Sequence, residues 1–361
     1  MRLHERTWSR ASPTETPPQR AARLNGHKEH QARQRARRLA HLDVLLDRAS
    51  DALNEEWAHC APAQPCGIYP VDWSALPAGC DPCSVSAKMA PGTARGERKR
   101  ESISAIAYVL STLALSAAAP TIVDAGCGTG SLLLPLAALF PNATFVGIDY
   151  KQGSIARLAG RASEAGDPIA GRVVPWKGRI EDYDGPIDAL VSLHACGGAS
   201  DAALRVAAER RVPFAVSPCC IGKLRRGPSS RWLQQLLLAH RADDPDPTTA
   251  EAKASQSFAL LAAWADSEHV GAAVAAPSSL RKGALAGADA ATDAAAAAHL
   301  VAATRRERSK TLVELDRLIG MHETAMGGGA MLVSGRLLSI QGRAMATSGQ
   351  TELLVGSIRA A

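Results

Sequence analysis

The sequence predicts an α/β fold whose core is a mostly parallel, doubly wound sheet with an antiparallel hairpin at its C-terminal end. Between residues 121 and 216, short apolar segments recur roughly 20–30 residues apart and alternate with amphipathic segments. Such alternation is typical of parallel sheets covered by helices on both faces. Two further apolar segments, 331–340 and 351–358, are expected to form the hairpin. Hydrophobic residues make up 46% of the 361 residues and charged residues 21%, which is sufficient for a large core.

Each element is predicted from the spacing of its apolar residues. Steps of three and four residues predict amphipathic helices over residues 29–58 and 101–119. Short apolar segments that end near glycine or polar residues predict strands. The expected strands span residues 121–126, 143–150, 172–176, 189–193 and 213–216, and further helices are expected at 132–140, 201–209, 251–265 and 305–323.

Composition divides the chain into three parts. Residues 1–28 lack apolar periodicity and are expected to be a disordered basic tail or an organelle transit peptide, with a phosphate-binding arm as a third hypothesis. Residues 29–97 are predicted to be a helical, cysteine-containing N-terminal extension. Residues 98–361 are predicted to form the main domain, with insertions near 227–250 and near 271–304, the second rich in alanine and glycine.

The positive charge is concentrated at the N-terminus. The chain has 41 Lys/Arg and 35 Asp/Glu, but residues 1–38 alone hold ten Lys/Arg and three Asp/Glu, so the remainder is nearly neutral. The body is therefore not predicted to be a strongly basic nucleic-acid binder. Without a long apolar segment or a secretory signal, and with only eight cysteines, we expect a cytoplasmic protein with no membrane partner. The Arg-rich N-terminus makes a mitochondrion or plastid the alternative, and the oligomeric state stays open.

A glycine-rich turn, VDAGCGTGS, follows the first strand of the predicted sheet. Gly126, Gly128 and Gly130 have the spacing G-x-G-x-G, whereas the dinucleotide fingerprint is G-x-G-x-x-G. Asp124 stands two residues before the first glycine, and Asp149 ends the next strand. Such a turn lets the backbone approach a ligand closely at the N-terminus of the following helix.

This arrangement resembles motif I of class I S-adenosylmethionine-dependent methyltransferases. The resemblance implies that Asp124 and the glycines surround the methionine part of S-adenosyl-L-methionine, and that Asp149 accepts hydrogen bonds from the ribose hydroxyls. An acidic contact to the adenine is expected after the third strand. Arg179 occupies that position, so we predict that Glu181 makes the contact, with helix capping as the alternative.

Cysteines follow two of the predicted strands. His194 and Cys196 lie in LHACG, and Cys219 and Cys220 lie in SPCC. Ligands of parallel sheets bind beyond the carboxyl ends of the strands, so these four residues are predicted to be catalytic. One hypothesis has them shape the substrate pocket, with His194 as a base or orienting group whose pKa is near the operating pH. A second has a cysteine thiolate attack a pyrimidine ring, and the third is packing alone.

LHACG followed by a Ser–Asp pair, together with PCC-x-GK, resembles the methyltransferase-like domain of the glutathione S-transferase C-terminal domain-containing protein family. The resemblance extends over about residues 95–358. It implies a Rossmann-like class I methyltransferase sandwich of seven strands, six parallel and one reversed. It also implies methyl transfer, with tRNA or rRNA as the expected substrate. A catalytically inactive S-adenosylmethionine-binding protein and an NAD-dependent oxidoreductase are the alternatives. No glutathione transferase domain is evident in residues 1–94.

Four cysteines and a basic segment precede the glycine-rich turn. Cys60, Cys66, Cys80 and Cys83 include one C-x-x-C pair, so a structural zinc site is one hypothesis and unpaired thiols in a packed loop are the other. The segment RGERKRES at 95–102 is either a solvated helix start or a source of cations for the cofactor carboxylate or a substrate phosphate. Its candidate cations are Arg98, Lys99 and Arg100.

Overall fold

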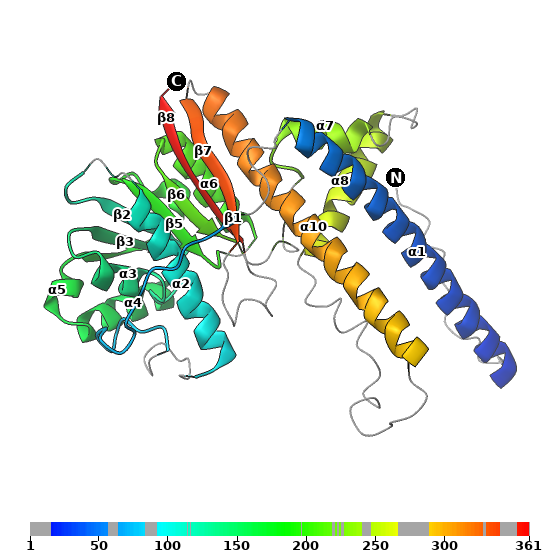
Figure 1. Ribbon diagram of the computed structural model, residues 1–361, viewed down its shortest axis with the longest axis horizontal. Coiled ribbons are helices and arrows are strands. Elements are labelled where there is room, and N and C mark those ends of the chain that lie inside the picture. Colours follow the sequence, from blue (N-terminus) through cyan, green and yellow to red (C-terminus); the bar gives the residue numbers. More distant parts are fainter. Residues whose placement is uncertain are drawn as a thin grey trace.

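The computed structural model of the chain combines a twisted sheet, covered by helices on both faces, with a group of long helices beside it (Figure 1). The structure describes residues 16–56, 64–83, 92–113, 115, 117–195, 197–218, 221, 224, 227–239, 247–265, 289–327, 330–339 and 352–360. The strands are β1 (Gln64–Pro65), β2 (Thr121–Ala125), β3 (Thr144–Asp149), β4 (Val173–Lys177), β5 (Ala189–Leu193), β6 (Phe214–Ser217), β7 (Ala330–Ser339) and β8 (Glu352–Ala360).

The helices include all those that the apolar spacing predicts. Three of them begin well before the predicted starts, because α1 begins at Pro17, α2 at Ala94 and α10 at Asp289, and α2 ends at Thr112 rather than at residue 119. The helices are α1 (Pro17–Glu56), α2 (Ala94–Thr112), α3 (Leu133–Leu139), α4 (Gln152–Glu164), α5 (Asp167–Ala170), α6 (Gly198–Arg210), α7 (Arg231–Ala239), α8 (Pro247–Ala265) and α10 (Asp289–Gly327), with a 3₁₀ turn, η1 (Ile180–Asp182).

The sheet has the order β1-β7-β8-β6-β5-β2-β3-β4. Strands β2 to β6 pair in parallel, and β8 runs antiparallel to both β6 and β7. Strand β7 therefore points the same way as β6, which confirms the predicted arrangement of six parallel strands and one reversed strand. The two-residue strand β1, beside β7, is an eighth strand that the sequence did not predict. Because the chain winds outward in opposite directions from β2 and β5, a ligand site is expected where these two strands end.

Alternating strand residues divide the core between the two faces of the sheet. Ile122 and Phe145 face a cluster that includes residues of α2, α3 and α4. Val123 and Val146 face a second cluster that includes residues of α6, α10 and α1. Strand β5 is buried at all five positions because helices cover it on both sides.

The second half of helix α1, from Leu42 onward, is part of the folded body rather than a separate extension. Leu42 and Leu45 are fully buried and belong to the same cluster as the sheet residues. The Arg305 guanidinium of α10 donates to Asp43 at 2.5 and 2.6 Å, and the imidazole of His41 lies 2.9 Å from the hydroxyl of Ser257 in α8. The helices α1, α7, α8 and α10 thus form one helical module from separate parts of the sequence (Figure 1).

The predicted disorder of residues 1–28 is wrong for their second half. The α1 helix begins at Pro17, and proline is well tolerated at the first helical position. The segment that follows is rich in Ala, Arg and Gln, which are strong helix formers. Residues 1–15 and 266–288 lie outside the described residues, and α10 already begins at Asp289, within the expected insertion. Among the described helices, none is long and apolar enough to cross a membrane.

Candidate active site

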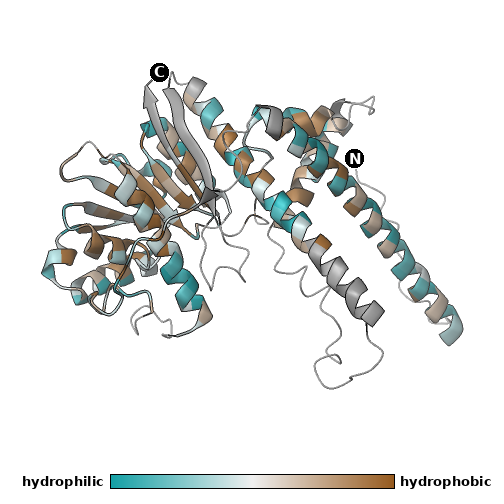
Figure 2. Ribbon diagram, in the orientation of Figure 1, coloured by the Kyte–Doolittle hydropathy of each residue, from teal (hydrophilic) through white to brown (hydrophobic). Residues whose placement is uncertain are grey.

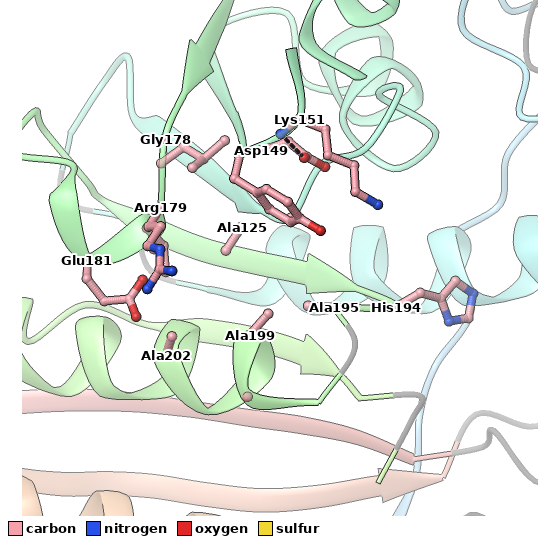
Figure 3. A pocket seen from close by; sticks show the side chains of 15 residues that line it. Ala125, Asp149, Lys151, Gly178, Arg179, Glu181, His194, Ala195, Ala199 and Ala202 are labelled. Atoms are coloured by element: carbon pink, nitrogen blue, oxygen red, sulfur yellow. Dashed lines mark hydrogen bonds between the residues drawn. The ribbon is translucent and has the colours of Figure 1, made fainter. Parts of the chain in front are cut away.

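A cleft of about 570 Å³ lies beyond the carboxyl ends of β2, β3, β4 and β5 (Figure 3). Its position is the point where the strand order reverses, as expected for a ligand site in an open parallel sheet. The volume falls in the usual range for small-molecule sites. Its lining includes Ala125, Gly126, Asp149, Tyr150, Lys151, Arg179, Glu181, His194, Ala195, Ala199 and Ala202.

The three loop glycines all have a left-handed backbone, with φ of 77° at Gly126, 57° at Gly128 and 80° at Gly130. Side chains other than glycine rarely adopt this conformation. A Cβ atom at Gly130 would also lie 2.5 Å from Cδ1 of Leu158, whereas at Gly128 it would meet no atom within 4 Å. Leucine side chains therefore pack against the loop at Gly130, whereas the space beside Gly128 is open. This open space leaves room for a ligand against the backbone.

Asp149 joins the glycine loop to the turn after β3. Its Oδ2 accepts a hydrogen bond from the Gly128 amide at 3.1 Å, and its Oδ1 accepts one from the Lys151 amide at 2.8 Å. The side chain also lines the cleft (Figure 3). A carboxylate offers about four lone-pair sites, so two backbone contacts leave capacity for ligand hydroxyls.

Asp124, on β2, is a buried carboxyl group with an unused oxygen. It is 1% exposed, and within the described part of the chain its Oδ2 has no hydrogen-bond partner. The pKa of Asp124 is raised to about 7, because burial and the charge of Asp149 raise it by more than the charge of Lys99 lowers it. An orphaned buried oxygen of this kind calls for a hydrogen-bond donor or a cation that the described chain does not supply.

His194 lines the opposite end of the cleft from Arg179 and Glu181 (Figure 3). Its backbone φ is 64°, an unusual value for a residue with a side chain, and its amide donates to the Ser217 carbonyl at 3.1 Å. This bond ties the HACG segment to the end of β6, where the PCC segment begins. Cys196, Cys219 and Cys220 lie outside the described residues.

The electrostatic surroundings of His194 differ from the prediction. Burial, together with the charges of the nearby cations Lys99 and Arg95, lowers its pKa to about 3. The imidazole is therefore neutral at physiological pH, and its pKa is not near the operating pH. A neutral ring still offers one donor and one acceptor, so it can orient a substrate group.

Glu181 lines the cleft from η1 and forms an ion pair with Arg205 of α6 at 3.2 Å. The pair is partly exposed, so it contributes little to stability. The structure thus places Gly126, Asp149, Glu181 and His194 around one cleft, and their predicted roles toward a cofactor and a substrate stay predictions.

The basic segment before the glycine loop forms the start of α2. Arg100 is not a ligand-facing cation, because it pairs with Asp81 at 2.8 Å and lies over the ring of Trp73. Lys99 is the cation whose charge acts on both Asp124 and His194. Arg95, one turn earlier, also acts on His194 and is a residue that the sequence analysis missed. Its i,i+4 spacing from Lys99, which places both on one face of α2, is the feature that would have identified it.

The N-terminal cysteines do not gather into a metal centre in the described part of the chain, where no cluster of three or more metal-ligating side chains is found. Cys66 and Cys80 are buried against α2 and its neighbours, and burial raises the pKa of each thiol to about 11. Cys83 is also buried, whereas Cys60 lies outside the described residues. Protonated, packed thiols are the arrangement that these observations favour.

Residues 98–227 match a family model described as a methyltransferase domain. Over these residues, about a third of its length, the chain is similar to this methyltransferase family. The matched region contains the cleft residues Gly126, Asp149 and His194, and its sequence also includes the HACG and PCC segments. The predicted resemblance is therefore confirmed for this region.

Two curated relatives bear the family name that the motifs suggested. The glutathione S-transferase C-terminal domain-containing protein of Xenopus laevis is 31% identical over 162 residues, 44% of this chain and 25% of the relative. The Drosophila melanogaster homolog is 30% identical over 185 residues, 48% of this chain and 30% of the relative. The similarity thus spans between a quarter and a third of the relatives' length.

Among solved structures, the RNA methyltransferase from Salinibacter ruber in complex with S-adenosyl-L-homocysteine is 18% identical, with a TM-score of 0.25. The match covers 30% of this chain and 70% of that one. A likeness at this level carries no argument about function.

Proposed function

We propose that this protein transfers a methyl group from S-adenosyl-L-methionine to RNA, with tRNA or rRNA as the expected substrate. The observation that carries the proposal is the cleft at the strand-order reversal, bordered by a glycine loop with an open approach at Gly128 and by the carboxylate of Asp149. This site lies within the matched methyltransferase domain.

The residues present fit the parts of this cofactor. The orphaned oxygen of Asp124 suits a positively charged ammonium group such as that of the methionine moiety. Lys99, whose charge acts on Asp124, is a suitable partner for the methionine carboxylate. Asp149 would accept the ribose hydroxyls, and Glu181 would accept a hydrogen bond from the adenine amino group.

The bound cofactor supplies an electrophilic methyl group, and the chain's own residues would bind and orient the acceptor. His194 is expected to hold a substrate group in line with that methyl through its neutral imidazole, because a ring with a pKa of about 3 carries one N–H proton and no second proton at pH 7. Cys196, Cys219 and Cys220 remain candidates either for shaping the pocket or for thiolate attack on a pyrimidine ring.

A methyl-transfer assay tests this proposal. Purified protein and methyl-tritiated S-adenosylmethionine are incubated in two parallel reactions. One reaction contains unmodified RNA and the other contains a protein extract. We expect label in the RNA fraction that nuclease releases. We also expect at least a tenfold lower rate for His194→Ala, and an unchanged rate for the exposed control Arg157→Gln.

Three other results of this assay would each exclude one part of the proposal. Label only in the protein fraction would rule out the RNA substrate. No label in any fraction, from protein that binds S-adenosylhomocysteine, would identify a catalytically inactive cofactor-binding protein. A His194→Ala variant as active as the wild type would remove the assigned role of the imidazole.

A further inference from the structure

The first half of α1, residues 17–38, is called the basic arm here. It holds seven Lys/Arg and one Asp/Glu, whereas residues 39–56 of the same helix hold one Lys/Arg and five Asp/Glu. The charge therefore changes sign at about the point where the helix begins to pack on the body. The basic residues of the arm are Arg20, Arg23, Lys28, Arg33, Arg35, Arg37 and Arg38.

The basic arm is exposed over nearly its whole length. The arm extends away from the sheet and is predominantly hydrophilic (Figures 1 and 2). Arg33 lies 3.8 Å from Glu29, but both side chains are about 70% exposed, so this pair neutralises the arm only weakly. By contrast, Leu42 and Leu45 in the second half are fully buried. The second half of α1 thus packs on the body, whereas the basic arm has no comparable buried face among the described residues.

A groove of about 400 Å³ lies between the arm and α8. Arg35 and Arg38 line it together with the amide side chains of Gln31 and Gln34, and Trp264 of α8 lines its other side. Guanidinium groups bind phosphate oxygens in a fixed bidentate geometry, amides donate to phosphate and sugar oxygens, and an indole ring is a surface for base stacking. The groove therefore combines the groups that recognise a nucleic-acid strand.

The composition of the arm argues against a membrane surface. A helix that lies on a membrane presents a continuous apolar face with large residues such as Leu, Phe or Trp. Leu24 is the one large apolar residue among residues 17–38. The dominant interaction available to this surface is therefore electrostatic attraction to phosphates.

We propose that the basic arm and the adjoining groove bind the phosphate backbone of an RNA and hold it on the helical module. This inference rests on the proposed function in taking RNA as the substrate. It also explains how a chain whose remaining residues are nearly neutral would capture a polyanion, because the positive charge is gathered on one exposed helix.

Fluorescence anisotropy with a labelled, unmodified tRNA transcript tests the inference between 50 and 200 mM salt. The variant Arg35→Gln/Arg38→Gln removes two groove cations. The matched control Arg48→Gln/Arg157→Gln removes two exposed cations outside the arm. We expect the arm variant to bind about tenfold more weakly and to lose about 1–2 units of salt slope, whereas the control stays close to the wild type.

Equal affinity and equal salt slope for the arm variant and the wild type would overturn the inference. So would an equal loss in the control, which would indicate unspecific charge attraction. Binding of the wild type to phosphatidylserine vesicles but not to RNA would also overturn it. S-adenosylhomocysteine titration of the same preparations separates this result from the proposed function, since the arm variant is expected to keep its cofactor affinity.

Discussion

Gly128 and Gly130 lie two residues apart in one loop and are required for different physical reasons. Both have positive φ, but only Gly130 also lacks room for a Cβ, because Leu158 would lie 2.5 Å from it. Space above Gly128 is open in the described structure. Gly128 therefore leaves open space beside the loop, and Gly130 allows the loop to pack against Leu158 of α4.

This difference gives a prediction at the residue scale. Gly130→Ala is expected to lower the free energy of unfolding by about 2–4 kcal/mol, from backbone strain and overpacking. Gly128→Ala is expected to cost about 1–2 kcal/mol and to weaken S-adenosylhomocysteine binding, because the added methyl group enters the open space. Urea unfolding and calorimetric titration measure the two effects. Equal stability of Gly130→Ala and wild type would contradict the packing argument.

The sequence was sufficient to predict that Asp149 and His194 reach the cleft, but not the protonation of His194. The predicted cofactor residues Asp124, Gly128 and Gly130 are not among the residues that line the cleft. Asp149 and His194 follow strands, and the ends of parallel strands meet at one edge of a sheet, so their placement is a matter of topology. The low pKa of His194 depends mainly on its burial, and also on the charges of Lys99 and Arg95 of α2, which precede it by about 100 residues. Neither burial in the folded chain nor a charge interaction over this sequence distance has a local pattern in the sequence.

At the scale of the elements, α10 holds the start of α6 through a buried ion network. The Arg317 guanidinium donates to Asp201 at 2.7 Å and to Glu314 at 2.9 Å, and its side chain is 1% exposed. Asp201 lies in the first turn of α6, directly after the HACG segment. Asp316 accepts backbone hydrogen bonds from Ser229 and Ser230, so α10 also fixes the segment that leads into α7.

Removal of this arginine is expected to destabilise the protein strongly. Arg317→Ala leaves Asp201 and Glu314 without their buried partner, which costs about 3–5 kcal/mol of unfolding free energy. The matched control is Arg231→Ala. This arginine lies 3.6 Å from Glu323 but is 79% exposed, so its loss costs about 0–1 kcal/mol. Denaturant titrations compare the two variants, and similar losses would show that the buried network contributes no more than a surface pair.

On the scale of the whole molecule, the helical module and the sheet share one core. Leu42 of α1, Phe258 of α8 and Leu315 of α10 belong to the cluster that also contains Val123 of β2. Local periodicity predicted each helix but not their assembly, because the three segments are far apart in the chain. Apolar periodicity also explains why residues 17–28 were wrongly predicted to be disordered. A lack of apolar periodicity predicts that a segment does not pack, and this segment is helical without packing.

The proposed methyl transfer requires the cleft to be a cofactor site, and calorimetric titration with S-adenosylhomocysteine tests this most directly. Wild-type protein is compared with Asp149→Ala and with the control Glu164→Ala, an exposed acid on α4. We predict one-to-one binding to the wild type and the control, and binding at least tenfold weaker to Asp149→Ala. Folded wild-type protein that binds NAD but not S-adenosylhomocysteine would contradict the assignment of the cleft as a methyltransferase site.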